Sequence, residues 1–336
     1  MARNGKFLNM SKILYSIQTT GMGHVTRSME VINLLKSKGH DVDILVSGQN
    51  YQGDFGIDIK YRFPGLSFDT EKKIDLKNLF SNNNPLRFIK DIYKLDLYPY
   101  DLVITDFEPI TSWKGLLSGR RVLGIGNHYK FFETRITLQA SFLINKFLCW
   151  LASPVLDYIG FDYIKSPNRK ILNPIIKGDI SNKGVTSGDY YMTYLHNYSW
   201  DEQYDFFKKY PNEKFKIYTK VATKTQMGNC EIVPIDKDNF TKDLLESKGV
   251  ITNAGFQTTS ECLYLGKKMW IIPINNQIEQ YYNCSVLREL GVICGYTLND
   301  EDFTRLNSTE YRIKIYYETN TMDRVMGRIN KRLEIK

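Results

Sequence analysis

The run NAGFQTTSE combines a glycine, two threonines and a glutamate in a spacing that suits a ligand carrying phosphate and hydroxyl groups. Gly255 lets the backbone approach such a ligand, and the helix expected after it offers unpaired N–H groups and the positive end of its dipole. Thr258 and Thr259 add hydroxyl donors in the first helical turn. Glu261, one turn into the helix, can accept both hydroxyls of a ribose, as acidic residues do in nucleotide sites.

Further polar residues belong to the same stretch of chain. Asn253 stands in the strand and turn GVITNAG (249–255), two positions before Gly255. Glu279 and Gln280 open the helix expected after the strand at 269–274, and they offer acceptors and donors for sugar hydroxyls. We therefore expect all three residues on the ligand-binding side of this part of the chain.

A histidine lies between a glycine pair and an arginine in GMGHVTRS, where an apolar strand (13–17) passes into a helix. Such a strand-to-helix turn opens at the carboxyl end of a parallel sheet, where ligands bind, so His24 is expected to face a crevice with Gly21, Gly23 and Arg27. Two alternatives stay open from the sequence. The glycines can form a tight turn without a ligand, and His24 can be a solvent-exposed helix cap.

Polar residues also end the next two expected strands. Asp106 follows the strand at 102–105, and Asn127 and His128 follow the strand within 121–129. Because these strands should line the same crevice, we expect Asp106 and Asn127 near His24. The alternative for Asp106 is a helix N-cap, a position that aspartate often takes.

Strands and helices alternate along both halves of the chain, which predicts an α/β protein of two doubly wound, Rossmann-like domains facing a cleft. The most apolar segment, 138–156, is read as a core helix or as a surface helix that dips into anionic lipid headgroups. The predicted boundaries are an N-terminal domain (1–165), a linker (166–186), a second domain (187–307) and a helical tail (308–336) that packs back on the first domain.

Composition narrows the functional class. The 336 residues carry a net charge of +8 with 42% hydrophobic residues, and residues 1–150 hold 20 basic against 14 acidic side chains. A basic first half suits an anionic membrane or an acidic small molecule as a ligand. Nucleic acid is not expected, because no zinc finger, RNP-type motif or Arg-rich tract is present.

Five cysteines without a CxxC spacing indicate neither a disulfide framework nor a zinc site. Without a recognisable signal peptide or long apolar span, we expect a cytoplasmic protein.

The run 251–291 resembles the donor-binding half of GT-B glycosyltransferases, most closely the group with the enzyme that adds N-acetylglucosamine to make lipid II. Gly255, Thr258 and Glu261 match that group's diphosphate and ribose element, and EQYYN (279–283) matches its sugar-reading element. PID (234–236) matches the loop whose backbone holds uracil, which implies a role for Ile235. GMGHVTRS is similar to the group's glycine loop on the acceptor side.

Two positions differ from that group. Its glycine-rich phosphate loop is replaced here by HNYS (196–199), which places His196 and Asn197 at the donor. Glu279 stands where the lipid II-forming enzyme has glutamine, which bears on the identity of the donor sugar.

The resemblance implies an inverting transferase that moves a sugar from a UDP-sugar to a hydroxyl of a glycan or a lipid-linked acceptor. In it His24 is the general base and Asp106 orients and charge-stabilises its imidazole, with no metal or other cofactor required. The form G-x-G-H-x-x-R is also similar to a nucleotide-sugar hydrolase of the same fold, which uses water in place of an acceptor. A third reading is a basic, membrane-associated protein that binds nucleotide without turnover.

Overall fold

The computed structural model describes residues 10–66, 84–132, 140–181, 184, 186–275, 277–308, 310, 313–315, 317 and 320–334, without the side chains of 140–145 and 237. These residues form two compact units. Unit 1 contains the described residues from 10 to 175 and from 320 to 334, and unit 2 those from 176 to 317.

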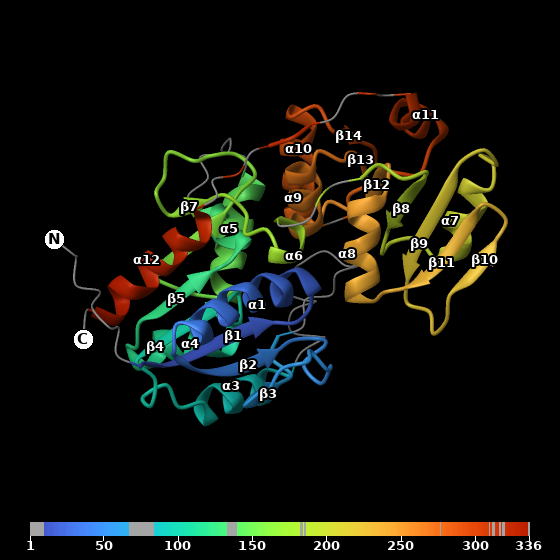
Figure 1. The fold of residues 1–336 in the computed structure, drawn as a ribbon. Coiled ribbons are helices and arrows are strands. Elements are labelled where there is room, and N and C mark those ends of the chain that lie inside the picture. The colour runs from blue at the N-terminus through green and yellow to red at the C-terminus, as the bar shows by residue number, and fades with distance from the viewer. Residues whose placement is uncertain are drawn as a thin grey trace. The chain divides into compact units, whose positions relative to one another are not determined.

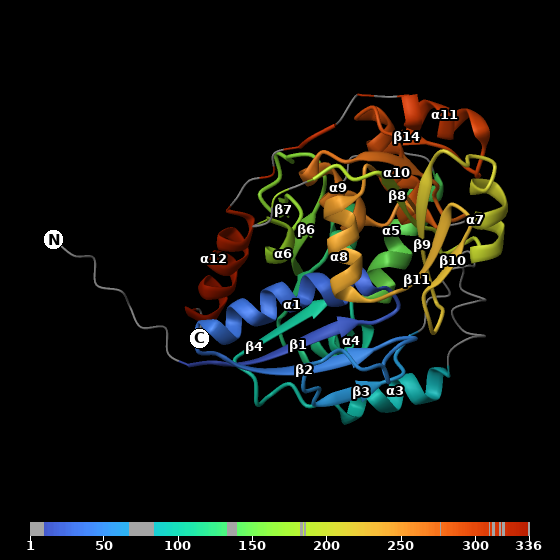
Figure 2. The same ribbon diagram turned by 45° about the vertical axis from the view of Figure 1, so that its right-hand side comes forward.

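Unit 1 is built on a parallel sheet in the order β3-β2-β1-β4-β5-β6-β7. Its strands are β1 (Lys12–Gln18), β2 (Asp41–Ser47), β3 (Tyr61–Phe63), β4 (Leu102–Asp106), β5 (Val122–Ile125), β6 (Asp157–Phe161) and β7 (Ile171–Leu172). The arrows of β1 and β2 run side by side in one direction (Figure 2). Strand order reverses between β1 and β4, so their carboxyl ends border the crevice where doubly wound sheets bind ligands.

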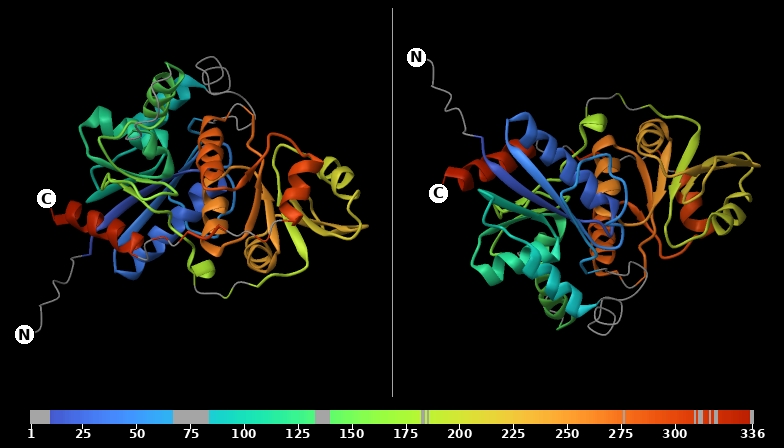
Figure 3. Two further views of the ribbon diagram at one scale, coloured as in Figure 1. Left: turned by 90° about the horizontal axis from the view of Figure 1, so that it is seen from above. Right: turned by 90° about the horizontal axis from the view of Figure 1, so that it is seen from below.

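Helices cover both faces of this sheet. The blue α1 and the red α12 lie on one face, and the cyan α3 and teal α4 lie on the other (Figure 3). Helix α12 is tied to unit 1 by Arg328, whose guanidinium donates to the carbonyl of Tyr158 at 3.2 Å, and by the ion pair of Arg332 with Asp157. The helices of the unit are α1 (Met22–Ser37), α3 (Pro85–Lys94), α4 (Pro109–Ser118), the 3₁₀ helix η1 (Asn127–Phe132), α5 (Ala140–Ala152) and α12 (Thr321–Glu334).

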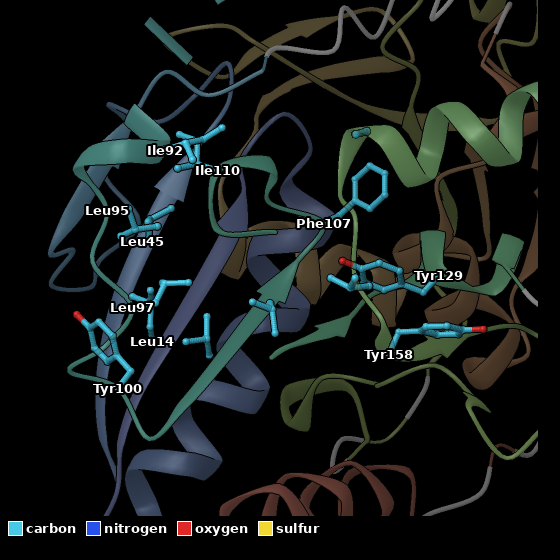
Figure 4. Packing of buried hydrophobic residues seen from close by; sticks show 14 of the residues in the cluster. Leu14, Leu45, Ile92, Leu95, Leu97, Tyr100, Phe107, Ile110, Tyr129 and Tyr158 are labelled. Carbon is cyan, nitrogen blue, oxygen red and sulfur yellow. The ribbon is translucent and has the colours of Figure 1, made fainter. Parts of the chain in front are cut away.

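One part of the core of unit 1 fills the space between the sheet and α3, α4 and η1. Leu14 and Leu45 of the sheet meet Ile92 of α3 and Ile110 of α4, while Tyr129 of η1 extends the cluster toward β6 (Figure 4). These apolar contacts fix the carboxyl ends of the strands, and with them the polar residues that follow.

Unit 2 repeats the doubly wound plan, with the sheet order β10-β11-β9-β8-β12-β13-β14 (Figure 1). Only the pair β10 and β11 is antiparallel among the described strands of this sheet. Its strands are β8 (Tyr190–Tyr194), β9 (Lys214–Thr219), β10 (Thr225–Met227), β11 (Cys230–Pro234), β12 (Gly249–Thr252), β13 (Lys268–Ile271) and β14 (Ile293–Cys294). Its helices are α6 (Gly178–Ser181), α7 (Trp200–Phe207), α8 (Lys237–Glu246), α9 (Phe256–Leu265), α10 (Ile278–Glu289) and α11 (Asp300–Ser308).

The predicted fold class of two doubly wound α/β units is confirmed. The first half of the predicted linker (166–186) is not a connection, because Ile171 and Leu172 form β7, which pairs with β6 of unit 1. The predicted apolar helix is present as α5, where Cys149 packs on the core and Phe147 is exposed. Among the described residues, no helix combines the length and apolar character that crossing a bilayer requires.

Candidate active site

The strand-to-helix turn after β1 presents His24 at the switch point of unit 1. Gly21 is the N-cap of α1 in an extended conformation with φ of −128°, and Gly23 and His24 lie in the first helical turn. The side chain of His24 is 13% exposed, so the alternative of a solvent-exposed cap is wrong. The glycines do form the first turn of α1, in which the N–H of His24 donates to the carbonyl of Gly21 at 3.2 Å.

Asp106, at the carboxyl end of β4, accepts a hydrogen bond from the imidazole of His24. The distance from His24 Nδ1 to Asp106 Oδ1 is 2.7 Å, and the carboxylate is fully buried. An ionised carboxylate only accepts, so Nδ1 carries the proton and Nε2 keeps its lone pair. Asp106 is not a helix N-cap, because Glu108 caps α4 by accepting from the backbone N–H groups of Ile110 and Thr111.

Two further residues of α1 fix the carboxylate. Arg27 donates from Nη2 to Asp106 Oδ1 at 2.6 Å and from Nε to Oδ2 at 3.0 Å, and Ser28 donates to Oδ2 at 3.1 Å. Because residues three and four apart share a helix face, one turn of α1 supplies all three partners of Asp106. Arg27, predicted on the acceptor side, is instead buried beneath the histidine and neutralises Asp106.

The charges of this cluster determine its protonation. Burial alone would raise the pKa of Asp106, but Arg27 and His24 outweigh it and hold this pKa below the ordinary value of 3.8. Burial lowers the pKa of His24 below its ordinary 6.5, and Arg27 and His128 add to the lowering although Asp106 opposes it. His24 is therefore neutral at pH 7 and able to accept a proton at Nε2.

An aromatic stack holds the histidine from the side. The ring of His128 lies parallel to that of His24, with centroids 5.2 Å apart and an interplanar angle of 10°. Phe107 also stacks on His128, at 4.3 Å and 18°, and its ring centroid lies 6.5 Å from that of His24. Phe107 has φ of 57°, in the left-handed region that costs a non-glycine residue free energy, and this backbone turn carries its ring to His128. Asn127, the other predicted residue of this loop, is buried at the start of η1.

At the switch point of unit 2, helix α9 begins at Gly255 without any side-chain cap. The first N–H groups of any helix have no partner within that helix, so the uncapped start of α9 has the feature that the predicted anion site requires. Thr258 is partly exposed in this turn. Thr259 differs from the prediction, because it is buried and its hydroxyl donates to the carbonyl of Gly255 at 2.7 Å, which directs this donor into the helix rather than toward a ligand.

Side-chain amides tie the loops around α9 together. Asn253 accepts from the backbone N–H of His196 at 2.7 Å and donates to Asn197 Oδ1 at 2.7 Å, which joins the loops after β8 and β12. Gln280 Oε1 accepts from the N–H groups of Ala254 at 3.1 Å and Ile274 at 2.9 Å. The structure therefore brings the predicted residues after β8, β12 and β13 together in one hydrogen-bonded cluster.

Glu261 is deeper than predicted. Its side chain is 1% exposed, it accepts from Gln257 at 2.7 Å, and Lys177 Nζ lies 3.7 Å from its Oε1. Ile235 follows β11 and is exposed, and Glu279 lies partly exposed in the first turn of α10. Within the described ranges, no three His, Cys, Asp or Glu side chains come together as a metal site.

The sequence prediction missed Ser28, Phe107, Gln257 and Lys177. Ser28 and Gln257 lie four residues from His24 and Glu261 respectively on the same helices, so helical spacing could have found them. No local pattern marks Phe107 or Lys177, because the role of each depends on the turn of the backbone or on a contact distant in sequence.

Solved structures that share this fold include several glycosyltransferases. SnogD from Streptomyces nogalater is 11% identical, with a TM-score of 0.54 over 97% of this chain and 96% of that one. SsfS6 of Streptomyces sp. SF2575 in complex with thymidine diphosphate is 11% identical, with a TM-score of 0.57 over 96% of each chain. The spinosyn rhamnosyltransferase SpnG, also with thymidine diphosphate, is 10% identical with a TM-score of 0.56 over 96% of each chain.

The family model described as glycosyl transferase family 1 matches residues 11–314. The chain therefore belongs to glycosyl transferase family 1. A comparison with curated proteins finds no match.

Proposed function

We propose that this glycosyltransferase moves a sugar, with inversion, from a UDP-sugar to a hydroxyl of a glycan or lipid-linked acceptor. The observation that carries the proposal is the bond of 2.7 Å between a neutral His24 and the buried Asp106 at the switch point of unit 1. A histidine with a free Nε2 lone pair beside a carboxylate is suited to remove a proton from a hydroxyl.

The proposed reaction has unit 1 supply the base and unit 2 bind the donor. His24 Nε2 takes the proton of the acceptor hydroxyl while its oxygen forms a bond to the anomeric carbon of the donor sugar. The bond from that carbon to the diphosphate oxygen breaks on the opposite face, and the diphosphate leaves with the electron pair. Asp106 stabilises the imidazolium that forms. General base assistance is worth about 10² to 10⁴ in rate, and no step is assigned to a metal ion.

In the proposed donor site, the uncapped start of α9 binds the diphosphate through backbone N–H groups, and the backbone at Ile235 holds the base. Glu261 would accept the two ribose hydroxyls after exchanging its contact with Gln257. This role favours UDP over thymidine diphosphate, because deoxyribose lacks the 2′-hydroxyl. Glu279 and Gln280 are placed at the sugar in this proposal, with Asn253, His196 and Asn197 shaping the loops around it.

The acceptor class follows from the resemblance to the lipid II-forming group and from the basic first half of the chain. The bond between His24 and Asp106 supports a hydroxyl rather than an amine as acceptor, because a hydroxyl needs its proton removed as it attacks. Cell-envelope glycans and their lipid-linked precursors combine a hydroxyl with negative charge, and a cytoplasmic enzyme would meet them at the inner membrane face.

The test is a screen of UDP-sugars and dTDP-sugars, with and without pooled glycan and lipid-linked acceptors, that follows release of nucleotide and transfer of sugar separately. We expect a UDP-sugar to be consumed only when an acceptor is present, and His24→Ala to abolish transfer while UDP affinity stays within about fivefold. Release of nucleotide without an acceptor at the full rate would instead identify a nucleotide-sugar hydrolase. Binding of UDP without turnover, unchanged in His24→Ala, would leave only a nucleotide-binding protein.

A further inference from the structure

Helix α3 has an inner face that packs on the core and an outer face without a protein partner among the described residues. Ile92 and the following Leu95 are buried against Leu45 and Ile110 (Figure 4). Asn84 caps the helix by accepting from the N–H of Arg87 at 3.0 Å. The inner contacts and the cap account for the position of α3, and neither uses its outer face.

The outer face carries large apolar side chains. Leu86 is 81% exposed, Ile89 49% and Tyr93 74%. These residues follow one another at i, i+3 and i+7, which places them in one stripe along the helix. A single exposed leucine needs no explanation, but a stripe of three large apolar residues on one short helix marks an interaction surface.

A basic stripe runs beside the apolar one. Lys90 and Lys94 are four residues apart and exposed, and Arg87 is exposed next to them. The one acidic residue of α3, Asp91, is buried on the inner face. Although Asp91 lies 4.0 Å from both Arg87 and Lys94, the outer face presents three cations and no exposed carboxylate of the helix itself.

We propose that the outer face of α3 binds the surface of an anionic lipid bilayer, with Leu86, Ile89 and Tyr93 inserted among the headgroups and Arg87, Lys90 and Lys94 contacting lipid phosphates. An exposed apolar stripe flanked by lysines and arginine is the pattern of helices that lie in the plane of a membrane. Charge complementarity selects the occupant, because three exposed cations against the single buried carboxylate of Asp91 leave a net positive face that repels a basic partner and attracts a negative surface. The inference concerns unit 1 alone and does not depend on the proposed sugar transfer.

The experiment is co-sedimentation of the full chain with vesicles of phosphatidylcholine containing either none or 30 to 40% phosphatidylglycerol, about the range in which surface charge attracts basic segments. We expect binding to the anionic vesicles only, with weakening as salt is raised. Leu86→Gln combined with Tyr93→Gln should lower the partition coefficient at least about tenfold through the lost apolar insertion. Lys90→Ala combined with Lys94→Ala should lower it about 25-fold, since each charge is worth about fivefold.

The matched control is Leu156→Gln, because Leu156 is a leucine of unit 1 that is 82% exposed outside α3. It should bind as the wild type does. Phe147→Gln tests α5, the other helix of this unit with an exposed aromatic residue among the side chains that the structure describes. Loss of binding in Phe147→Gln with full binding in both α3 variants would overturn the proposal, as would binding to neutral and anionic vesicles alike. Absence of binding to any vesicle, with a dimer in solution that the α3 variants dissociate, would show that a second copy covers this face instead.

Discussion

Replacing Asp106 by asparagine disturbs two roles at once, because the same carboxylate orients His24 and neutralises Arg27. Asparagine keeps the shape of the side chain, but it has one carbonyl oxygen in place of two charged ones. The guanidinium of Arg27, which is 2% exposed, is then left buried without a counter-charge. His24 loses the negative charge that would stabilise its protonated form.

The size of the stability effect follows from this burial. Removing one partner of a buried ion pair costs about 3 to 5 kcal/mol, since the remaining charge cannot recover its hydration. For a unit of about 150 to 250 residues, that free energy corresponds to a Tm lower by about 6 to 20 °C. Ser28→Ala is the matched control, because it keeps both charges while removing the hydroxyl bond of 3.1 Å to the same carboxylate, and it should cost about 1.5 to 3 kcal/mol.

The assay pairs thermal unfolding with initial rates of sugar transfer. Asp106→Asn should lose about 10² to 10⁴ in kcat together with the drop in Tm. Adding Arg27→Met to Asp106→Asn removes the unpaired cation, so most of the Tm should return while kcat stays low. A Tm of Asp106→Asn within about 2 °C of the wild type, or a double variant less stable than the single one, would show that the ion pair does not hold this site together.

Three further predictions follow from the remaining geometry. Because His24 must be neutral to act, the acid limb of the pH profile of kcat/KM should have its midpoint below pH 6.5. The unfolded chain binds a proton at His24 more readily than the folded chain, so the free energy of unfolding should fall as the pH drops below 6.5, and it should fall by less in His24→Gln. A kinetic midpoint at or above pH 6.5 contradicts both expectations. Glu261→Gln should weaken UDP binding about 10- to 100-fold by calorimetry but thymidine diphosphate binding less, whereas equal losses would argue against a contact with the 2′-hydroxyl. His128→Phe preserves a flat ring beside His24 and should keep kcat, whereas His128→Ala should lower it about 2- to 12-fold; identical rates in the two variants would mean that stacking does not orient the base.

Much of the fold could be predicted from the sequence because the central strands are buried on both faces. The apolar runs of β1, β4, β12 and β13 are short, continuous and bounded by glycine or polar residues, which is typical of parallel strands. The short strands β3, β7 and β14 could not be predicted, since two or three residues carry no periodicity and become strands only by pairing with a neighbour.

The site residues also differ in this respect: some positions follow from the neighbouring sequence, and others depend on contacts with residues far away in the chain. His24 and Asp106 could be paired from the sequence because each follows a buried strand, and parallel strands bring such residues to one edge. The burial of Glu261 could not be foreseen, because it depends on Lys177, which lies 84 positions earlier in the chain and meets the carboxylate only in the folded unit. The position of Phe107 depends on a left-handed backbone conformation that phenylalanine rarely adopts, so the residue type at this position would predict a different backbone.

The two switch points share a topology but are built from different chemistry, and the proposed reaction explains the difference. A base that gains a proton is stabilised by a nearby carboxylate. Asp106 is that carboxylate, and its ion pair with Arg27 allows it to stay charged although it is buried. A loop that receives a diphosphate must be rigid without negative charge, because a carboxylate there would repel the ligand. Amides meet both demands: Gln280 holds the N–H groups of Ala254 and Ile274, and Asn253 holds that of His196, beside the start of α9, which has no side-chain cap.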